Sequence, residues 1–205
     1  PNYGPLGFTP YDIDLYKGKL YITSNDGILV FSPKGKFLQR WGQKGREIGF
    51  YDFPNGLVID KKRGVIYVAD VLNRRVVALT PKGNVLWVAG KPDVEGRIVS
   101  YFGLPRGIAV DSEGLIYVTD TFNARIVVLN QKGELVSLVG SRGTKDAQFN
   151  FPDGIAITND GVIYIADRAN DRVQAIRINQ LFPPPKAELD KYGQSFFKVK
   201  KGVAK

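Results

Sequence analysis

An aspartate, an asparagine and an arginine recur three times in the chain at one fixed spacing. The sets are Asp70, Asn73 and Arg75; Asp120, Asn123 and Arg125; and Asp167, Asn170 and Arg172. Carboxylates beside cationic side chains are groups that an acid–base or cation site would use. Because each of these copies carries them, we expect structural roles instead. Asp would accept from N–H groups of the loop between the second and third strands, and Arg would pair with a carboxylate of its own or an adjacent repeat.

The side chains most often used for catalysis at neutral pH are missing. The 205 residues contain no histidine and no cysteine, which removes the commonest general base, thiol nucleophiles, thiolate metal sites and disulfides. Residues 42–45, GQKG, lack the spacing and the following helix of a phosphate-binding loop. No run of about eighteen apolar residues occurs, so the sequence predicts no membrane span.

A proline marks the start of each repeated copy. Pro54, Pro105 and Pro152 are each followed two residues later by glycine, and Pro10 begins a weaker first copy. These prolines are separated by 44, 51 and 47 residues. Periods of about 40 to 50 residues, with short β-branched runs between glycine turns, are typical of β-propeller blades with four strands each.

The second copy shows the strand pattern most clearly. Short runs rich in β-branched residues lie between turn signals, and Pro81 with Gly83 marks the last turn. The four strands expected here are 56–60, 65–70, 75–80 and 84–89. The fold class is therefore predicted to be all-β, a propeller of four-stranded antiparallel blades.

The other copies give the same pattern. They predict strands at 13–15, 20–23, 28–31 and 36–41; at 107–111, 115–120, 125–130 and 134–139; and at 154–158, 162–167 and 172–179. Blades are expected at about 8–42, 53–90, 104–140 and 151–179, within a propeller region 1–179. Residues 180–205 are proline-rich and basic. They would either lead into the first strand of a fifth blade or form a basic, partly disordered tail.

Three copies resemble a known repeat. Phe-Pro-Asn-Gly-Leu-Val-Ile-Asp at 53–60, Ile-Tyr-Val-Ala-Asp at 66–70 and Asn-Arg-Arg-Val at 73–76 resemble the NHL repeat, as do the copies beginning at 104 and 151. The resemblance covers about 8–179 and implies a propeller, usually six-bladed, of which four blades are recognisable here. Further blades would then come from a longer chain or from a partner. The family's histidine position departs from the pattern, because it holds Arg74, Ala124 and Asp171.

Positions that differ between copies are the better candidates for function. The position after the repeat proline holds Tyr11, Asn55, Arg106 and Asp153, all expected near the mouth of a central channel. Aromatics that recur three residues before the proline are instead expected in the core. These are Tyr51, Phe102 and Phe149.

The first copy adds two carboxylates, Asp12 and Asp14, where the others have glycine and an apolar residue. Residues i and i+2 of a strand point to the same side. Unpaired carboxylates are costly to bury there, so they imply water, a cation or an arginine partner such as Arg106. One alternative is a Ca²⁺ site with oxygen ligands from Asp12, Asp14, Asn55 and Asp153. Hydrated structural carboxylates are the other.

The long connections 42–53, 90–104 and 140–151 are expected to form one face with the neighbouring turns. They are rich in lysine and arginine, and Arg74, Phe122 and Arg168 project beside them. Acidic residues are interspersed. This composition favours a mixed-charge protein or glycan surface over a phosphate backbone.

The sequence therefore favours a non-catalytic interaction module outside the cytoplasm, which binds a protein partner or surface polymer within a larger assembly. Two alternatives stay open. The resemblance implies that some related propellers are metal-dependent lactonases or lyases, although lyases with histidine ligands are disfavoured in a chain without histidine. Some animal relatives of the repeat bind single-stranded RNA, and the net charge of +9 would suit an acidic partner. No cofactor is expected unless Ca²⁺ binds.

Overall fold

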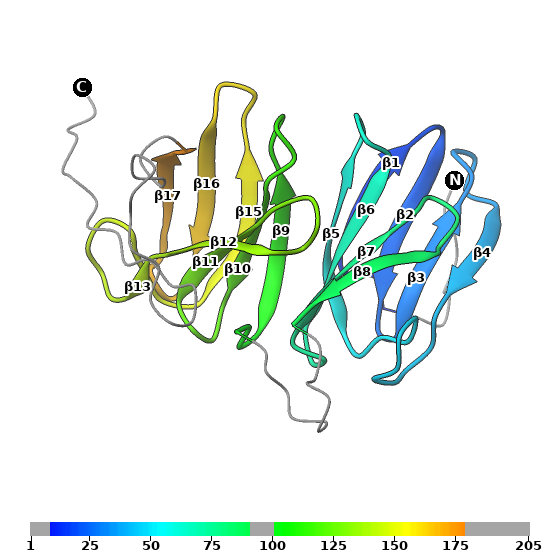
Figure 1. Cartoon of the computed structure of the whole chain (residues 1–205), viewed down its shortest axis with the longest axis horizontal. Helices are drawn as coiled ribbons and strands as arrows, with labels where there is room; N and C mark the ends of the chain where they lie inside the picture. Colours follow the sequence, from blue (N-terminus) through cyan, green and yellow to red (C-terminus); the bar gives the residue numbers. More distant parts are fainter. Residues whose placement is uncertain (1–8, 91–100, 179–205) are drawn as a thin grey trace. The chain divides into compact units, whose positions relative to one another are not determined.

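The computed structural model describes residues 9–90 and 101–178, and its regular elements there are β-strands apart from one short 3-10 helix. Strands that follow one another along the chain pair in antiparallel sheets, which we call blades (Figure 1). The chain divides into two compact units, Pro1–Ile108 and Ala109–Lys205. The expected all-β class with four-stranded antiparallel blades is confirmed. None of the described residues forms a helix of the length and hydropathy that a bilayer crossing requires.

Unit 1 contains two four-stranded blades. Blade 1 consists of β1 (Ile13–Tyr16), β2 (Lys19–Ser24), β3 (Gly27–Phe31) and β4 (Phe37–Trp41). Blade 2 consists of β5 (Pro54–Asp60), β6 (Val65–Asp70), β7 (Arg75–Leu79) and β8 (Val85–Ala89).

The next two blades follow along the chain, and the boundary between the units falls inside the first strand of blade 3. Blade 3 consists of β9 (Pro105–Val110), β10 (Ile116–Asp120), β11 (Arg125–Leu129) and β12 (Leu135–Val139). Blade 4 has three described strands, β15 (Pro152–Ile157), β16 (Val162–Asp167) and β17 (Arg172–Arg177). Between these blades, β13 (Ser141–Arg142) pairs in parallel with β14 (Gln148–Phe149), and η1 (Arg168–Asn170) joins β16 to β17.

The strands differ from the sequence prediction mainly at their starts. The first strands of blades 2, 3 and 4 begin at the repeat proline, two residues earlier than expected. Proline is tolerated as the first residue of a strand, because its missing N–H is not needed there. β7, β11 and β17 end one or two residues earlier than expected, since a turn or the end of the ladder follows. The expected segment 180–205 lies outside the described residues.

The core of unit 1 lies between blades 1 and 2. Tyr21, Ile28 and Val30 of blade 1 are buried against one face of blade 2. That face presents Leu57, Ile59, Ile66, Val68, Val77 and Leu79. Tyr51, from the connection between the blades, completes the cluster at 1% exposure, as predicted for a core aromatic.

The core of unit 2 repeats this arrangement between blades 3 and 4. Tyr117, Ile126 and Val128 of blade 3 are buried against blade 4, and Phe149 closes the cluster. The residues of blade 4 in this cluster are Ile163, Ile165 and Ile176. Phe102 and Phe149 are both fully buried, so the prediction for the repeated aromatics is confirmed.

Candidate functional site

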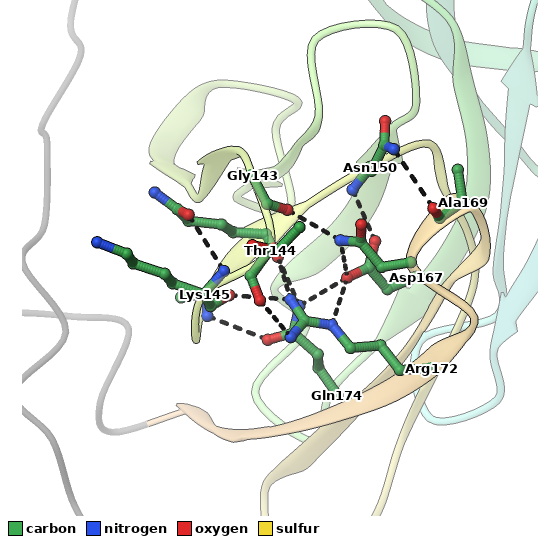
Figure 2. Close-up of polar contacts among 11 residues, drawn as sticks. Gly143, Thr144, Lys145, Asn150, Asp167, Ala169, Arg172 and Gln174 are labelled. Atoms are coloured by element: carbon green, nitrogen blue, oxygen red, sulfur yellow. Dashed lines mark hydrogen bonds and ion pairs between the residues drawn. The ribbon is translucent and has the colours of Figure 1, made fainter.

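The repeated aspartate, asparagine and arginine form a clamp at one end of each of blades 2, 3 and 4. In blade 4 the Asp167 carboxylate accepts hydrogen bonds from Asn150 N–H (2.7 Å) and from the side chains of Asn170 (2.8 Å), Arg172 (2.8 Å) and Gln174 (3.0 Å) (Figure 2). Asp167 is fully buried. Burial alone would raise its pKa, but these four donors together lower the pKa below its ordinary value of 3.8.

The same arginine holds the connection that leads into blade 4. Arg172 donates to the carbonyl oxygens of Thr144 (2.6 Å), Lys145 (2.9 Å) and Gln148 (2.8 Å) (Figure 2). Asn170 donates to the Gly143 carbonyl at 2.8 Å. These bonds attach residues 143–150 to the β16–β17 turn through main-chain oxygens.

Blade 2 carries an equivalent clamp in unit 1. Arg75 pairs with Asp70 at 2.8 Å and donates to the carbonyls of Arg46 (2.7 Å) and Phe50 (2.6 Å). Asn73 donates to Asp70 at 2.8 Å. Burial raises the pKa of Asp70 more than its cationic and amide donors lower it.

Each arginine was predicted to pair with a carboxylate of its own or an adjacent blade. In blades 2, 3 and 4 it pairs with the aspartate of its own blade, at 2.8, 3.2 and 2.8 Å. The loop that is held differs from the expectation. The arginines of blades 2 and 4 reach beyond the turn between the second and third strands to the connection before the first strand. Carbonyl oxygens of that connection face the guanidinium, which has donors in excess of those that one carboxylate can use.

The two carboxylates of the first copy join the inner strands of unit 1. Asp12 accepts from Leu57 N–H at 2.8 Å and Asp14 accepts from Ile59 N–H at 2.9 Å, so both point toward β5, as expected for positions i and i+2. Asp14 also pairs with Lys61 at 3.0 Å. These main-chain N–H groups and Lys61 are the partners, where the sequence suggested water, a cation or Arg106.

Burial raises the pKa of Asp12, although hydrogen bonds from Leu57 N–H and Ile13 N–H oppose that shift. No group of three or more acidic side chains able to hold a metal occurs within residues 9–90 and 101–178. The Ca²⁺ site drawn from Asp12, Asp14, Asn55 and Asp153 stays a prediction.

The positions after the repeat proline lie where blades begin. Asn55 in unit 1 and Asp153 in unit 2 are half-buried, and their carbonyl oxygens accept from Thr23 and Thr119 hydroxyls, each at 2.6 Å. The Asp153 carboxylate also lies 3.9 Å from Arg168. Thus the main chain at this position packs on the preceding blade within its unit, while the side chain varies.

Tyr11 and Arg106 are the other two residues that follow a repeat proline, and their surroundings differ from those of Asn55 and Asp153. Tyr11 donates to the Asn25 side chain at 3.2 Å, and its ring lies 4.5 Å from that of Phe53. Arg106 lies in β9 and is half-buried.

Aromatic and basic side chains lie at the end of unit 2 that carries the β10–β11 and β16–β17 turns, which we call its loop end. Phe122 is 59% exposed, and Arg142 donates to its carbonyl at 2.9 Å. The Arg142 guanidinium also lies 5.4 Å from the Phe151 ring centre and 3.2 Å from the Asn150 side-chain oxygen. We call Phe122, Arg142, Phe151 and Arg168 the unit 2 loop surface. The sequence singled out Phe122 but gave no sign that Arg142 would link it to Phe151.

Unit 1 exposes apolar side chains at the matching end of blade 2. Leu72 in the β6–β7 turn is 54% exposed and Ile48 in the preceding connection is 71% exposed. Arg74 is exposed beside Leu72 and adopts φ of 53°. Sequence reasoning missed Leu72, whose position in the turn matches that of Phe122 and could have identified it.

The blade architecture defines the chain as a β-propeller protein, and family comparisons agree. Residues 102–129 and 149–176 match the NHL repeat, and residues 8–80 match a family described as a 6-bladed beta-propeller. The chain is therefore an NHL-repeat β-propeller protein. No curated protein sequence matches it.

Solved structures with this fold have different roles. Virginiamycin B lyase from Staphylococcus aureus is 17% identical with a TM-score of 0.64, and the match covers 83% of this chain and 53% of that one. A chain of a nidogen/laminin complex is 22% identical with a TM-score of 0.60, covering 83% and 60%. A streptogramin B lyase is 18% identical with a TM-score of 0.53, covering 83% and 66%. These likenesses establish the fold, and the chain spans about half to two thirds of each matched chain.

Proposed function

We propose that this chain is a non-catalytic interaction module, which binds a protein partner or a surface polymer through the loop ends of its blades, outside the cytoplasm and within a larger assembly. The main support for this proposal is the unit 2 loop surface. Phe122 is 59% exposed, and Arg142 anchors its main chain. Exposed aromatic and arginine side chains on a fixed frame are characteristic of binding hot spots, because little side-chain and loop entropy is lost on association.

The clamps support this proposal by supplying the fixed frame. Arg172 binds three carbonyls of the connection that carries Arg142 and Phe151 at its ends. In unit 1, the apolar side chains of Leu72 and Ile48 are also exposed and available for binding. The nidogen/laminin complex provides a precedent for this fold in protein association.

A lyase function has weaker support. A catalytically inactive variant of the Staphylococcus aureus virginiamycin B lyase carries alanine in place of a histidine. The 205 residues of this chain contain no histidine. The three repeated carboxylates, whose spacing beside arginine first suggested acid–base chemistry, are each bound to the arginine and the asparagine of their own clamp.

Site-specific photo-crosslinking tests the proposal in cells that produce the protein. A photoreactive phenylalanine derivative at Phe122 is expected to give a discrete adduct with one partner. The same group at Lys132, an exposed residue in the turn at the other end of blade 3, is the matched control. Removing the side chain with Phe122→Ala is expected to weaken binding of the identified partner at least tenfold, as for a hot-spot residue. Equal adducts from both positions, or none from Phe122, would overturn the proposal.

A further inference from the structure

Arg142 of the unit 2 loop surface is held in place by contacts that leave its charge unpaired. It donates to the Asn150 side-chain oxygen at 3.2 Å and to the Phe122 carbonyl at 2.9 Å, and its guanidinium lies 5.4 Å from the Phe151 ring centre. A guanidinium has five N–H donors, so these two bonds leave three of them for a ligand. Within residues 9–90 and 101–178, Arg142 forms no ion pair.

Arg142 is an exception among the arginines of unit 2. Each of the other arginines in the described part of this unit lies within ion-pair distance of an aspartate. The pairs are Arg125 with Asp120 (3.2 Å), Arg168 with Asp153 (3.9 Å), Arg172 with Asp167 (2.8 Å) and Arg177 with Asp160 (3.9 Å). The fixed charge of Arg142 is therefore left for a carboxylate that the described residues do not supply.

The equivalent connection of unit 1 contains the carboxylate that unit 2 lacks. Counted from the glycine after the outer strand of the preceding blade, Arg142 corresponds to Lys44 and Asn150 corresponds to Asp52. Both units thus carry a cation at the first position, but only unit 1 carries an acidic residue at the second. In unit 2 a neutral amide oxygen faces the guanidinium instead.

An apolar side chain accompanies this unpaired charge. Phe122 supplies the carbonyl that Arg142 binds, and the phenylalanine is 59% exposed. A ligand group that reaches the remaining donors of Arg142 therefore has an exposed aromatic residue as its neighbour. The pair fits a carboxylate that lies close to an apolar group in the same ligand.

The polar groups of this surface favour a peptide over a glycan. Sugar hydroxyls require side-chain hydrogen-bond partners, and Asn150 is the amide of this surface. Its oxygen accepts from Arg142 and its nitrogen donates to the Ala169 carbonyl at 3.4 Å. The rings of Phe122 and Phe151 offer no such partner. Aspartate or glutamate near an aromatic or large aliphatic residue supplies both groups that the surface accommodates.

We propose that the unit 2 loop surface binds a peptide segment of a partner protein in which Asp or Glu lies close in sequence to an aromatic or large aliphatic residue. The carboxylate accepts from Arg142, and the apolar side chain packs on Phe122. A guanidinium that is already fixed loses little freedom when it pairs. This inference rests on the proposed function and adds the class of partner and the role of each residue.

Random peptides displayed on phage and selected on the immobilised full chain test this specificity. The enriched peptides are expected to combine an acidic residue with a nearby aromatic or large aliphatic residue. Because the chain has a net charge of +9, acidic peptides would also bind it without specificity. Each measurement therefore includes Lys132→Gln, which removes one exposed positive charge from the turn at the other end of blade 3.

Fluorescence anisotropy with an enriched peptide and its acid-to-amide version, Glu to Gln or Asp to Asn, assigns the carboxylate to Arg142. The parent chain and Lys132→Gln are expected to bind the amide version at least tenfold more weakly. Arg142→Gln should bind both peptides about equally, because the charge that distinguishes them is gone. An arginine that only positioned Phe122 would weaken both peptides by the same factor and preserve the tenfold difference. Arg142 is exposed, so the variant should retain its fold, as circular dichroism will verify.

The outcomes separate this inference from the proposed function. Equal discrimination by the parent and Arg142→Gln, or enriched peptides without an acidic residue, would overturn the inference and leave binding through this surface intact. Enriched peptides that bind Phe122→Ala and Arg142→Gln as tightly as the parent would overturn both. Polygalacturonate, an acidic glycan, should bind the parent and Arg142→Gln equally weakly. A selection that enriches no peptide, or glycan binding that requires Arg142, would also overturn the peptide specificity.

Discussion

The carboxylates of Asp70 and Asp167 occupy the same position in two clamps, yet their pKa values shift in opposite directions. Burial dominates at Asp70, where it outweighs Arg75, Asn73 and a main-chain N–H. At Asp167 the donors outweigh burial, and one of them is Gln174. The equivalent residue of blade 2 is Val77, which cannot donate. The two clamps therefore differ in two ways: the Asp70 carboxylate is more strongly desolvated, and only the Asp167 carboxylate has the additional Gln174 donor.

Replacing that amide, Gln174→Val, is expected to destabilise the protein by about 1–3 kcal/mol at pH 7, because Asp167 and the Gln148 carbonyl lose a donor. The pKa of Asp167 would rise, since one stabilising bond to its charged form is lost. A depressed folded-state pKa adds stability above the ordinary value of 3.8, and that stability is lost as pH falls through the folded pKa. Urea unfolding from pH 7 to pH 2 measures the effect.

The difference between parent and Gln174→Val should shrink as the pH falls through the pKa of Asp167. Gln131→Val, in an exposed turn, controls for the change of residue type and should alter stability by no more than about 0.5 kcal/mol. A stability difference that is constant from pH 7 to pH 2 would show that Gln174 acts only by packing.

The second residue-scale prediction concerns Asp14. Asp14→Ala should cost about 1–3 kcal/mol, because Ile59 N–H and Leu15 N–H lose their carboxylate acceptor. Lys61→Ala should cost less than about 1 kcal/mol, since the lysine is 60% exposed and exposed ion pairs contribute little. Thermal unfolding with and without a chelator checks both. A chelator-sensitive transition that becomes insensitive in Asp14→Ala would favour the Ca²⁺ alternative instead.

At this scale the sequence predicted geometry better than partners. It placed Asp12 and Asp14 on one side of a strand, because the side-chain period of a strand is two residues. It did not predict that main-chain N–H groups of β5 would donate hydrogen bonds to these carboxylates, because a main-chain donor has no signature in the sequence. Gln174 could have been noticed as a polar residue where the second and third copies have valine and the first has leucine.

Among the elements, the connections before blades 2 and 4 are irregular in sequence, yet main-chain pairing and clamp hydrogen bonds hold both of them. Residues 141–149 contain the parallel β13–β14 pair, and residues 44 and 51 form a parallel bridge at the equivalent place in unit 1. Each connection is then tied to its clamp arginine. The two connections are therefore ordered by specific hydrogen bonds, although their sequences show no alternation of apolar and polar residues.

Arg75→Ala should cost about 3–5 kcal/mol, because it leaves the buried Asp70 carboxylate and three carbonyls without the guanidinium. Arg75 is only 4% exposed, so water cannot readily replace it. Arg40→Ala, whose ion pair with Asp26 is exposed, should cost less than about 1 kcal/mol. Urea unfolding measures the loss, and amide exchange should accelerate in residues 43–52. Equal losses for the two variants would contradict the clamp.

The strands themselves were largely predictable. β6 and β16 have the expected bounds, because β-branched runs end at recognisable turns. The short β13–β14 pair was not predicted, since two residues are too few to establish a period. The clamp on the preceding connection was also missed, because its acceptors are carbonyl oxygens that every residue carries.

For the whole molecule, the net charge of +9 is the feature that keeps RNA binding open as an alternative. If the interaction surface is selective for proteins or glycans, single-stranded RNA should bind weakly. Its affinity should fall steeply between about 50 and 200 mM salt, as for non-specific phosphate contacts. Phe122→Ala and Arg106→Ala should leave this residual binding nearly unchanged. Fluorescence anisotropy across a salt series checks the expectation, and a large loss in either variant would favour RNA recognition.

Arg75 and Arg172, the clamp arginines of blades 2 and 4, bind the connections before their blades through hydrogen bonds to carbonyl oxygens. Such contacts do not depend on which side chains the connection carries. Exposed positions such as Arg46 and Lys145 can therefore be exchanged while their carbonyls continue to hold the backbone in place. This separation of anchoring from surface chemistry would let related chains diversify their specificity on a constant backbone, and it makes these two connections natural sites for a randomised binding library.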